Sequence, residues 1–207
     1  MAVHERWMES PIGQLRLLAE EGALVALHME EHRHVLDYVV ERGGRDPVLA
    51  EAEAQLSAWF AGERTSFDVA IRLKGTPFQL AVWSALQAIP YGETRSYSEI
   101  AATVGKPDAV RAVGAANGHN PISIVVPCHR VIGANGTLTG YGGGLPRKRW
   151  LLEHEQAVLA RAGRRTMRGQ VRLPLVAPPS ALGEVRPGRG DGSSERDSRT
   201  LLLRSVR

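Results

Sequence analysis

The sequence contains very little cysteine: Cys128 is the single one among 207 residues. One thiol cannot close a disulfide within the chain and cannot build a cysteine-rich zinc site. Apolar runs of about eighteen residues are absent, and the amino terminus lacks a basic stretch followed by an apolar one, so we expect neither a membrane span nor a signal peptide. A lone thiol without targeting signals predicts a cytoplasmic protein.

Charge of one sign is concentrated at one end of the chain, although the net charge is only +4. Residues 1–74 carry 8 basic and 13 acidic side chains, residues 75–156 carry 7 and 5, and residues 157–207 carry 11 and 4. The basic surplus therefore belongs to the last stretch. Its scattered Pro, Gly, Ser and Arg lack sustained periodicity, which predicts a disordered tail over 163–207.

Residues 1–74 have the pattern of a small α/β domain. Alternating apolar residues bounded by turn residues predict an antiparallel meander of strands at 7–10, 15–19 and 24–28. Apolar residues at helical spacing predict a helix over 47–61 that ends near Gly62, and residues 67–73 are expected to add one more strand.

From residue 75 the pattern becomes helical. Thr76 is a suitable N-cap residue, with Pro77 at the first helical position. Pro90-Tyr91-Gly92 should end the helix that begins there. A last helix is expected from about Pro146 to Arg161, which places the end of this domain near residue 162.

Two short helices are predicted between these longer ones. The first runs from Ser96 or Tyr97 to Val104 and ends at Gly105, and the second runs over 109–118 with Asp108 as its cap. Such a pair, joined by a glycine-containing turn, has the outline of a helix-turn-helix. The fold class is thus α+β: a small α/β domain followed by a helical, winged-helix-like domain over 75–162.

The chemistry-bearing feature is the pair Cys128-His129. A free thiol has a pKa of about 8.5, so it becomes a nucleophile at neutral pH only when a neighbouring group removes its proton. The pair by itself leaves three interpretations open: an inert buried cysteine, a cysteine hydrolase and a metal site.

The residues around the pair narrow this choice. Pro127-Cys128-His129-Arg130-Val131 resembles the active-site signature of the O6-alkylguanine-DNA alkyltransferases, also called methylated-DNA–protein-cysteine methyltransferases. Other segments match this family in order and spacing, at 75–79, 82–83, 89–94, 96–97, 111–114, 120–121, 141–144 and 150–155. The resemblance covers residues 1–156 and leaves the tail unmatched.

The resemblance implies a catalytic role for five residues. Cys128 would accept the alkyl group and be consumed, while His129 takes its proton through a water and Glu155 orients the imidazole. Tyr97 would donate a hydrogen bond to the departing purine. Asn120 would tie the recognition helix to the cysteine segment.

The resemblance also implies contacts with double-stranded DNA that contains O6-alkylguanine. The target nucleotide must leave the stack, and Arg111 would fill the space that this base flipping creates. Small side chains after it would let the helix approach the minor groove. The expected DNA-contacting residues are Arg111, Ala112, Gly114, Ala115, Thr94 and Ser96.

A pocket for the flipped base is implied by the same comparison. Its expected residues are Pro127, Val131, Tyr141, Gly142, Gly143 and Gly144. Backbone N–H groups of the glycines would reach O6, and the Val131 carbonyl would accept from the base's amino group. Some relatives have serine where this chain has Gly142, so the range of accepted alkyl groups stays open, as does O4-alkylthymine.

Cofactors and metals are not expected. His28, His32 and His34 suggest a zinc site, but their charged neighbours fit a solvated loop at least as well. We expect a monomer that repairs DNA in a single turnover. The alternative is an alkyltransferase-like protein that recognises damage without catalysis, and since such proteins lack the acceptor cysteine, Cys128 favours catalysis.

Overall fold

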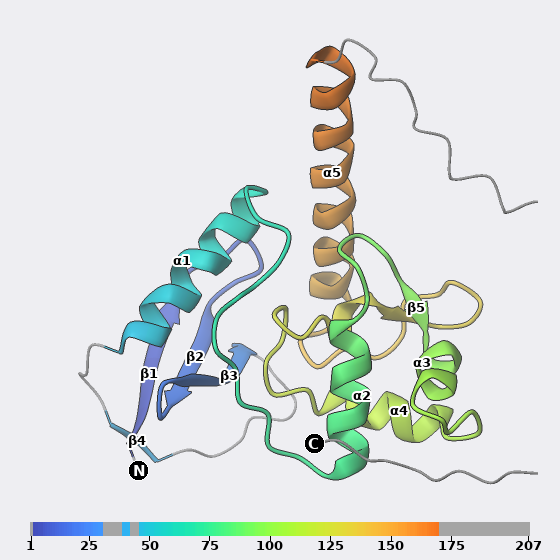
Figure 1. Cartoon of the computed structure of the whole chain (residues 1–207), viewed down its shortest axis with the longest axis horizontal. Helices are drawn as coiled ribbons and strands as arrows, with labels where there is room; N and C mark the ends of the chain where they lie inside the picture. The colour runs from blue at the N-terminus through green and yellow to red at the C-terminus, as the bar shows by residue number, and fades with distance from the viewer. Residues whose placement is uncertain (1, 31–38, 42–45, 170–207) are drawn as a thin grey trace, which may run out of the picture. The chain divides into compact units, whose positions relative to one another are not determined.

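The computed structural model of the chain describes residues 2–30, 39–41 and 46–169 (Figure 1). His32, His34 and residues 170–207 of the expected tail lie outside these ranges. The described part up to residue 169 forms one compact unit. None of its described helices is both long and apolar enough to cross a bilayer.

The amino-terminal half is built on a four-stranded sheet of order β3-β2-β1-β4. Its strands are β1 (Val3–Met8), β2 (Leu15–Glu20), β3 (Ala23–Met29) and β4 (Val40–Glu41). The first three form the predicted antiparallel meander, and β4 pairs parallel with β1. The first strand begins earlier than predicted, because pairing with β2 includes the polar residues before Trp7.

Helix α1 (Pro47–Ala61) lies against β1, β2 and β3 (Figure 1). The Asp46 side chain caps its start by accepting from the Val48 and Leu49 backbone N–H groups. Gly62 ends it in the left-handed region with φ of 75°, a conformation that costs glycine little. Both ends match the prediction. The buried face includes Leu49, Ala52, Leu56 and Trp59, and this face joins the central core.

The predicted strand over 67–73 was wrong: only Ile71 forms a bridge, to Leu24 of β3. The β3 edge is shared between two segments. Arg72 N donates to the Leu24 carbonyl, while Leu27 N donates to the Pro121 carbonyl and Ser123 N to the Leu27 carbonyl. The segment that leads to Cys128 therefore takes part of the edge that a full strand would need.

The second half carries the predicted helices α2 (Pro77–Gln87), α3 (Tyr97–Thr103) and α4 (Val110–Gly118). Thr76 and Ser96 begin the first two with capping boxes. The predicted Asp108 cap was wrong, because a turn closed by Ala109 N and the Lys106 carbonyl places Ala109 at the N-cap position.

A short 3-10 turn, η1 (Cys128–Arg130), leads to β6 (Val131–Ile132), which pairs parallel with β5 (Arg95–Ser96). Helix α5 (Leu145–Gly169) continues past the expected end near Arg161. Five of the eight added residues are Ala, Arg or Met, which favour helix, and Gly163 does not stop it. Core residues of both halves pack into one continuous cluster.

Candidate active site

Cys128 lies at the start of η1 and is 3% exposed. A tight turn delivers it, in which Val126 N donates to the Ile122 carbonyl and Cys128 N to the Val126 carbonyl. Ile124 in this turn has φ of 70°, which is a strained conformation for a β-branched residue and costs about 1–3 kcal/mol. The surrounding contacts must therefore hold the turn in place.

Asn120 supplies part of that support. It is 1% exposed, its Nδ2 donates to the Val126 carbonyl at 2.8 Å, and its Oδ1 accepts from Ile122 N at 3.1 Å. Burial raises the pKa of the Cys128 thiol, and hydrogen bonds with Asn120 and Ser123 and the charge of Lys148 oppose that rise only in part. The thiol therefore rests protonated.

His129 and Glu155 form a fully buried pair, with 2.8 Å between Nε2 and Oε1. Burial lowers the pKa of His129 even though the hydrogen bond and charge of Glu155 oppose this shift. The imidazole is then neutral, and its Nε2 proton is assigned to the bond with Glu155. Nδ1 is buried and has no hydrogen-bond partner among the described residues. A bare nitrogen of this kind can accept a proton.

Glu155 keeps its charge although it is fully buried. Burial alone would raise its pKa, but the hydrogen bonds and charges of His129 and Arg130 outweigh it and lower the pKa to about 2. The second carboxylate oxygen accepts from Gly92 N at 2.8 Å. The carboxylate thus joins α5 to η1 and to the turn after α2.

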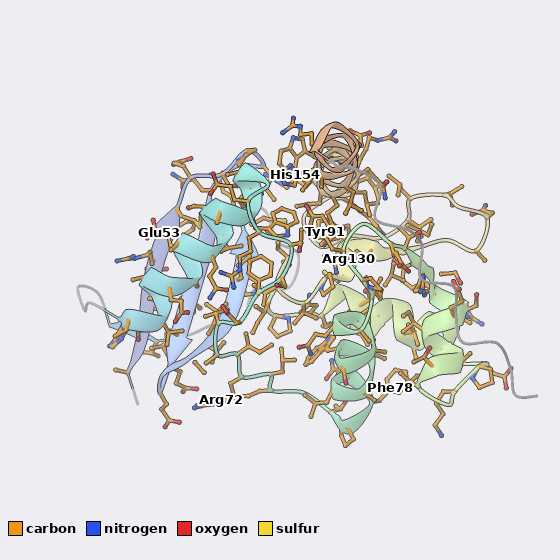
Figure 2. The ribbon with its side chains drawn as sticks, turned by 45° about the horizontal axis from the view of Figure 1, so that its top comes forward. Glu53, Arg72, Phe78, Tyr91, Arg130 and His154 are labelled. Atoms are coloured by element: carbon orange, nitrogen blue, oxygen red, sulfur yellow. The ribbon has the colours of Figure 1, made fainter. Side chains whose placement is uncertain are left out.

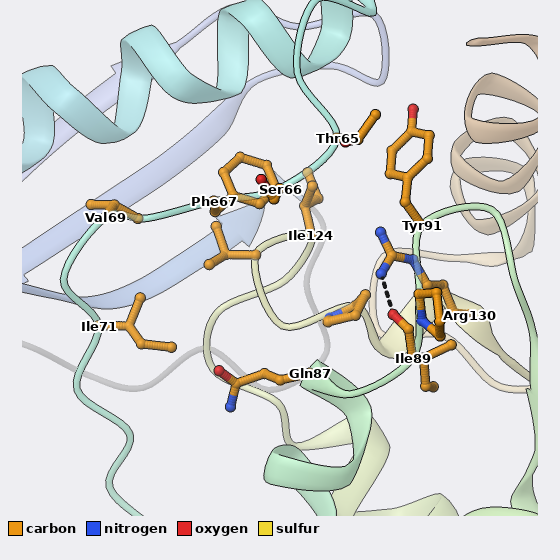
Figure 3. Close-up of a pocket in the computed structure, with 13 residues that line it drawn as sticks. Thr65, Ser66, Phe67, Val69, Ile71, Gln87, Ile89, Tyr91, Ile124 and Arg130 are labelled. Atoms are coloured by element: carbon orange, nitrogen blue, oxygen red, sulfur yellow. Dashed lines mark hydrogen bonds between the residues drawn. The ribbon is translucent and has the colours of Figure 1, made fainter. Parts of the chain in front are cut away.

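Arg130 received no role from the sequence, although it stands within the signature. It is 7% exposed and donates through Nε and Nη2 to Glu155 at 2.9–3.1 Å. Its Nη1 donates to the Ile89 carbonyl at 2.7 Å, as Figure 3 shows. The guanidinium lies 5.5 Å from the centre of the Tyr91 ring. Arg130 compensates the carboxylate charge that His129 alone, being neutral, cannot.

Lys148 on α5 is a second residue that the sequence did not single out. It is fully buried, and its Nζ donates to the carbonyls of Val131 at 2.5 Å, Thr139 at 2.7 Å and Gly140 at 3.3 Å. Burial lowers its pKa to about 8, and Cys128 acts in the opposite direction. The Val131 carbonyl, expected to face the base, already accepts from Lys148, although a carbonyl has a second lone pair.

Tyr97 shares two carbonyl partners with this ammonium group, and the expected pocket residues 141–144 follow those carbonyls in the chain. The Tyr97 hydroxyl donates to the Thr139 and Gly140 carbonyls, and burial raises its pKa. Tyr141 is 8% exposed, and burial raises its pKa well above 10. A Cβ at Gly143 would collide with the Met29 sulfur of β3, so any side chain there would force the Met29 side chain to move. Gly142 is partly buried beside it, and Gly144 has φ of 85°.

The expected DNA-contacting residues lie on one face of α4 and at the start of α3. Arg111, Ala112 and Ala115 are exposed and Gly114 is partly so, while Val113, Ala116 and Asn117 point into the core. Thr94 and Ser96 are half-buried. The buried Asn117 donates to the Cys128 carbonyl at 3.4 Å, a contact of α4 with the thiol segment that sequence reasoning missed.

A cavity of about 370 Å³ has Arg130 among its lining residues (Figure 3). It is lined by residues 65–71, by the end of α2 and by the turn before Cys128. Among the expected pocket residues it includes only Pro127, so it is not the predicted alkyl pocket. Phe67, Tyr91 and Arg130 are among the residues that line it, and Arg130 also bonds Glu155 of the buried relay.

Of the three histidines considered for a zinc site, the structure describes His28, and the other two lie outside the described residues. His28 is 1% exposed on β3, so the solvated-loop interpretation was wrong for it, because β3 is covered on both faces. No group of three or more potential metal ligands occurs in the part of the chain that the structure describes.

Comparisons with known proteins agree with the resemblance. Residues 3–73 match the family model of the 6-O-methylguanine DNA methyltransferase ribonuclease-like domain, and residues 77–157 match that of the 6-O-methylguanine DNA methyltransferase DNA binding domain. The methylated-DNA–protein-cysteine methyltransferase of Mycobacterium tuberculosis is 55% identical over 158 residues, which is 75% of this chain and 93% of that protein. The constitutive methylated-DNA–protein-cysteine methyltransferase of Bacillus subtilis is 51% identical over 138 residues, 65% and 84% of the two chains.

A solved structure is also similar. The crystal structure of Mycobacterium tuberculosis OGT in complex with DNA superposes with a TM-score of 0.69 at 55% identity, and it covers 75% of this chain and 94% of that one. The O6-methylguanine-DNA methyltransferase of Pyrococcus kodakaraensis, at 21% identity and a TM-score of 0.53, shares the fold.

Proposed function

Because this chain belongs to the methylated-DNA–protein-cysteine methyltransferase family, we propose that it moves an alkyl group from O6 of guanine in double-stranded DNA to its own Cys128. The observation that supports this most is the buried relay beside the thiol, His129 with Glu155 at 2.8 Å. The chain is thus a DNA-repair methyltransferase, and the non-catalytic alternative is not favoured.

The relay supports a displacement in which atoms and charges balance. Nδ1 of neutral His129 takes the thiol proton through a water, and the sulfur of Cys128 attacks the alkyl carbon. The bond between that carbon and O6 breaks, and its electron pair remains on the guanine. The product is a thioether on Cys128. Since nothing in this chemistry removes the alkyl group again, each molecule acts once.

Leaving-group stabilisation is assigned to Tyr97 and the backbone around it. The Tyr97 hydroxyl would donate to the purine as charge develops on O6 and N1, in exchange for its bonds to Thr139 and Gly140. Burial raises the pKa of this phenol, so it keeps its proton for donation. Backbone N–H groups at 142–144 would reach O6, Val131 would hold the amino group, and Pro127 and Tyr141 would form the walls.

Binding to the duplex is assigned to the exposed face of α4. The alkylated nucleotide must leave the stack, because O6 is not accessible to Cys128 within the duplex. Arg111 would occupy the vacated space, while Ala112, Gly114 and Ala115 let the helix approach the groove and Thr94 and Ser96 contact the backbone. In this assignment, different residues extrude the nucleotide and transfer the alkyl group, so the two steps can be measured separately.

Arg111→Ala therefore tests the DNA assignment. The variant should repair a duplex more slowly by a factor of about ten or more, while its transfer from free O6-benzylguanine stays near that of the unchanged protein, since a free base needs no extrusion. Single-turnover rates on both substrates measure the ratio. Equal slowing on the two substrates would mean that Arg111 shapes the pocket or the fold instead.

The chain would act as a cytoplasmic monomer without a cofactor. One chain supplies Cys128, His129 and Glu155, and a thiol nucleophile needs a reducing compartment. We divide the protein into an amino-terminal domain over 1–74, the catalytic domain over 75–162 and a tail over 163–207, of which the first seven residues continue helix α5. Every residue assigned to chemistry lies in the second part.

A label-transfer experiment tests the whole proposal. A duplex that carries radiolabelled O6-methylguanine is incubated with the protein, and label should appear on the protein at one equivalent per chain. Cys128→Ser should accept none while its duplex binding stays within a few fold, because Cys128 is buried and does not lie on the DNA-facing surface. Binding without transfer by the unchanged protein would favour the alkyltransferase-like alternative.

A further inference from the structure

Trp59, at the end of α1, is fully buried among five rings that come from separate parts of the chain. Its ring centre lies 4.9–6.4 Å from those of Phe60, Phe67, Tyr91, His129 and His154. Its carbonyl also bonds His154 Nε2 at 3.0 Å. Figure 2 shows Tyr91 and His154, two of these neighbours, between α1 and α5. Trp59 thus extends from the amino-terminal half to the relay.

The contact with His129 is the one that bears on catalysis. The two rings meet edge to face, with centres 6.4 Å apart and planes at 76°. The charged groups that act on this imidazole are Glu155 and Lys148 on α5 and Arg130 on η1. The titratable thiol of Cys128 precedes it in η1, and Tyr91 after α2 contacts Trp59 and Arg130. Each of these lies in the catalytic half, whereas Trp59 brings an apolar surface from the other half.

We infer that Trp59 is a positioning residue for the His129 base: the indole holds the imidazole in one orientation and keeps solvent from the side of the ring that it covers, while Nδ1 stays open to the single water that relays the thiol proton. The inference rests on the proposed role of His129. A proton acceptor has to be neutral before the thiol is activated, and its open nitrogen has to face the thiol. The bond with Glu155 fixes one side of the imidazole, and the Trp59 ring packed against it restricts rotation about that bond.

Exclusion of water is the second part of the effect. Burial is the largest cause that lowers the pKa of His129, and it works against the attraction of Glu155. Phe67 and Tyr91 contact Trp59 and also line the 370 Å³ cavity. A smaller residue at position 59 would extend this cavity towards His129. Water would then stabilise the imidazolium beside the Glu155 carboxylate, and the base would be protonated before the reaction starts.

The test compares Trp59→Leu with Trp59→Phe and with Trp150→Leu as the matched control. Trp150 packs on Phe60 and His154 in the same cluster, but it makes no ring contact with His129 in the described structure. The rate of transfer from free O6-benzylguanine is measured across pH 5 to 9, together with Tm. The free base removes DNA binding from the comparison.

Trp59→Leu should slow transfer at neutral pH by about tenfold, a part of the 10²–10⁴-fold that a positioned base contributes. The acid limb of its pH–rate profile should move to higher pH. Trp59→Phe should keep the limb in place, and Trp150→Leu should lower Tm without moving the limb. If Trp59→Leu does not fold, Trp59→Met takes its place, with the same expected shift.

An acid limb that stays in place in the Leu or Met variant overturns the inference, and so does an equal shift in Trp150→Leu. A further variant separates this failure from that of the proposed relay. His129→Asn should slow transfer more than any change at position 59. If it transfers at the rate of the unchanged protein, His129 is not the base, and both the relay and the inference fall.

Discussion

The two halves of the protein place their charges differently. In the amino-terminal half, ion pairs lie near the surface, such as Arg6 with Glu53 (labelled in Figure 2) and Lys74 with Glu20. In the second half, His129, Lys148 and Glu155 are fully buried and Arg130 nearly so. Surface pairs contribute about 0–1 kcal/mol each, whereas a buried charge costs several kcal/mol unless it is compensated.

The buried charges of the second half are not explained by their contribution to the stability of the fold. Apolar residues of the same size would fill the interior at least as well as a buried ion pair. The relay is kept charged by matched contacts instead, with Glu155 held by His129, by Arg130 and by Gly92. The buried charges of the second half therefore serve the chemistry at Cys128, whereas the ion pairs of the first half lie near the protein surface.

The largest expected effect comes from breaking the buried network. Glu155→Gln keeps the side-chain shape but leaves the Arg130 charge uncompensated, so the free energy of unfolding should fall by about 3–5 kcal/mol. Transfer should slow by about tenfold or more, because the imidazole loses the negative charge of its partner. Urea unfolding and single-turnover rates measure the two effects. A loss of stability below about 1 kcal/mol would mean that the network behaves like a surface pair.

Acid should remove the same contribution in the unchanged protein. The pKa of Glu155 is about 2 in the folded state, against an ordinary value of 4.5 for a glutamate carboxyl in water. A lowered pKa stabilises the fold above the unfolded value, and this contribution is lost as pH falls from about 4.5 to about 2. Its size is about 3 kcal/mol at most. Unfolding free energies of the protein and of Glu155→Gln should therefore converge over this range, and parallel curves would contradict the assignment.

Lys148→Met should have an intermediate effect. The change keeps an unbranched side chain but removes the donor to three carbonyls, so stability should fall by about 1–3 kcal/mol. The charge of Lys148 lowers the thiol pKa, so the alkylation of Cys128 by iodoacetamide should require higher pH in the variant. An unchanged pH dependence would show that Lys148 acts on the loop and not on the sulfur.

The smallest effect is expected in the amino-terminal half. Arg6→Ala removes the pair with Glu53, in which both side chains are about one-third exposed. The free energy of unfolding should fall by less than about 1 kcal/mol, and more salt should reduce even that difference. Transfer from the free base should not change. A loss as large as that of Glu155→Gln would remove the contrast between the halves.

Local patterns predicted most of the elements because local chemistry decides them. Asp46 and Gly62 mark the ends of α1, and Thr76 and Ser96 begin their helices through side-chain bonds to nearby N–H groups. The error in the sheet arose where distant segments compete. The strand over 67–73 did not form, because residues 121–123 take part of the same β3 edge.

The sequence by itself determined the α+β class, both ends of α1, the starts of α2 and α3 and the family, since these depend on neighbouring residues and on a contiguous signature around Cys128. The tertiary structure decided which groups surround the thiol and its His129–Glu155 relay. Four elements contribute these groups, namely Arg130, Lys148, Asn117 and Trp59. No spacing within the sequence predicts that they lie close together. The physical reason is that burial and the compensation of charge are properties of the packed interior. Lysine and arginine are usually exposed, so the sequence alone predicts that they lie on the surface, and only the folded structure shows that these two are buried.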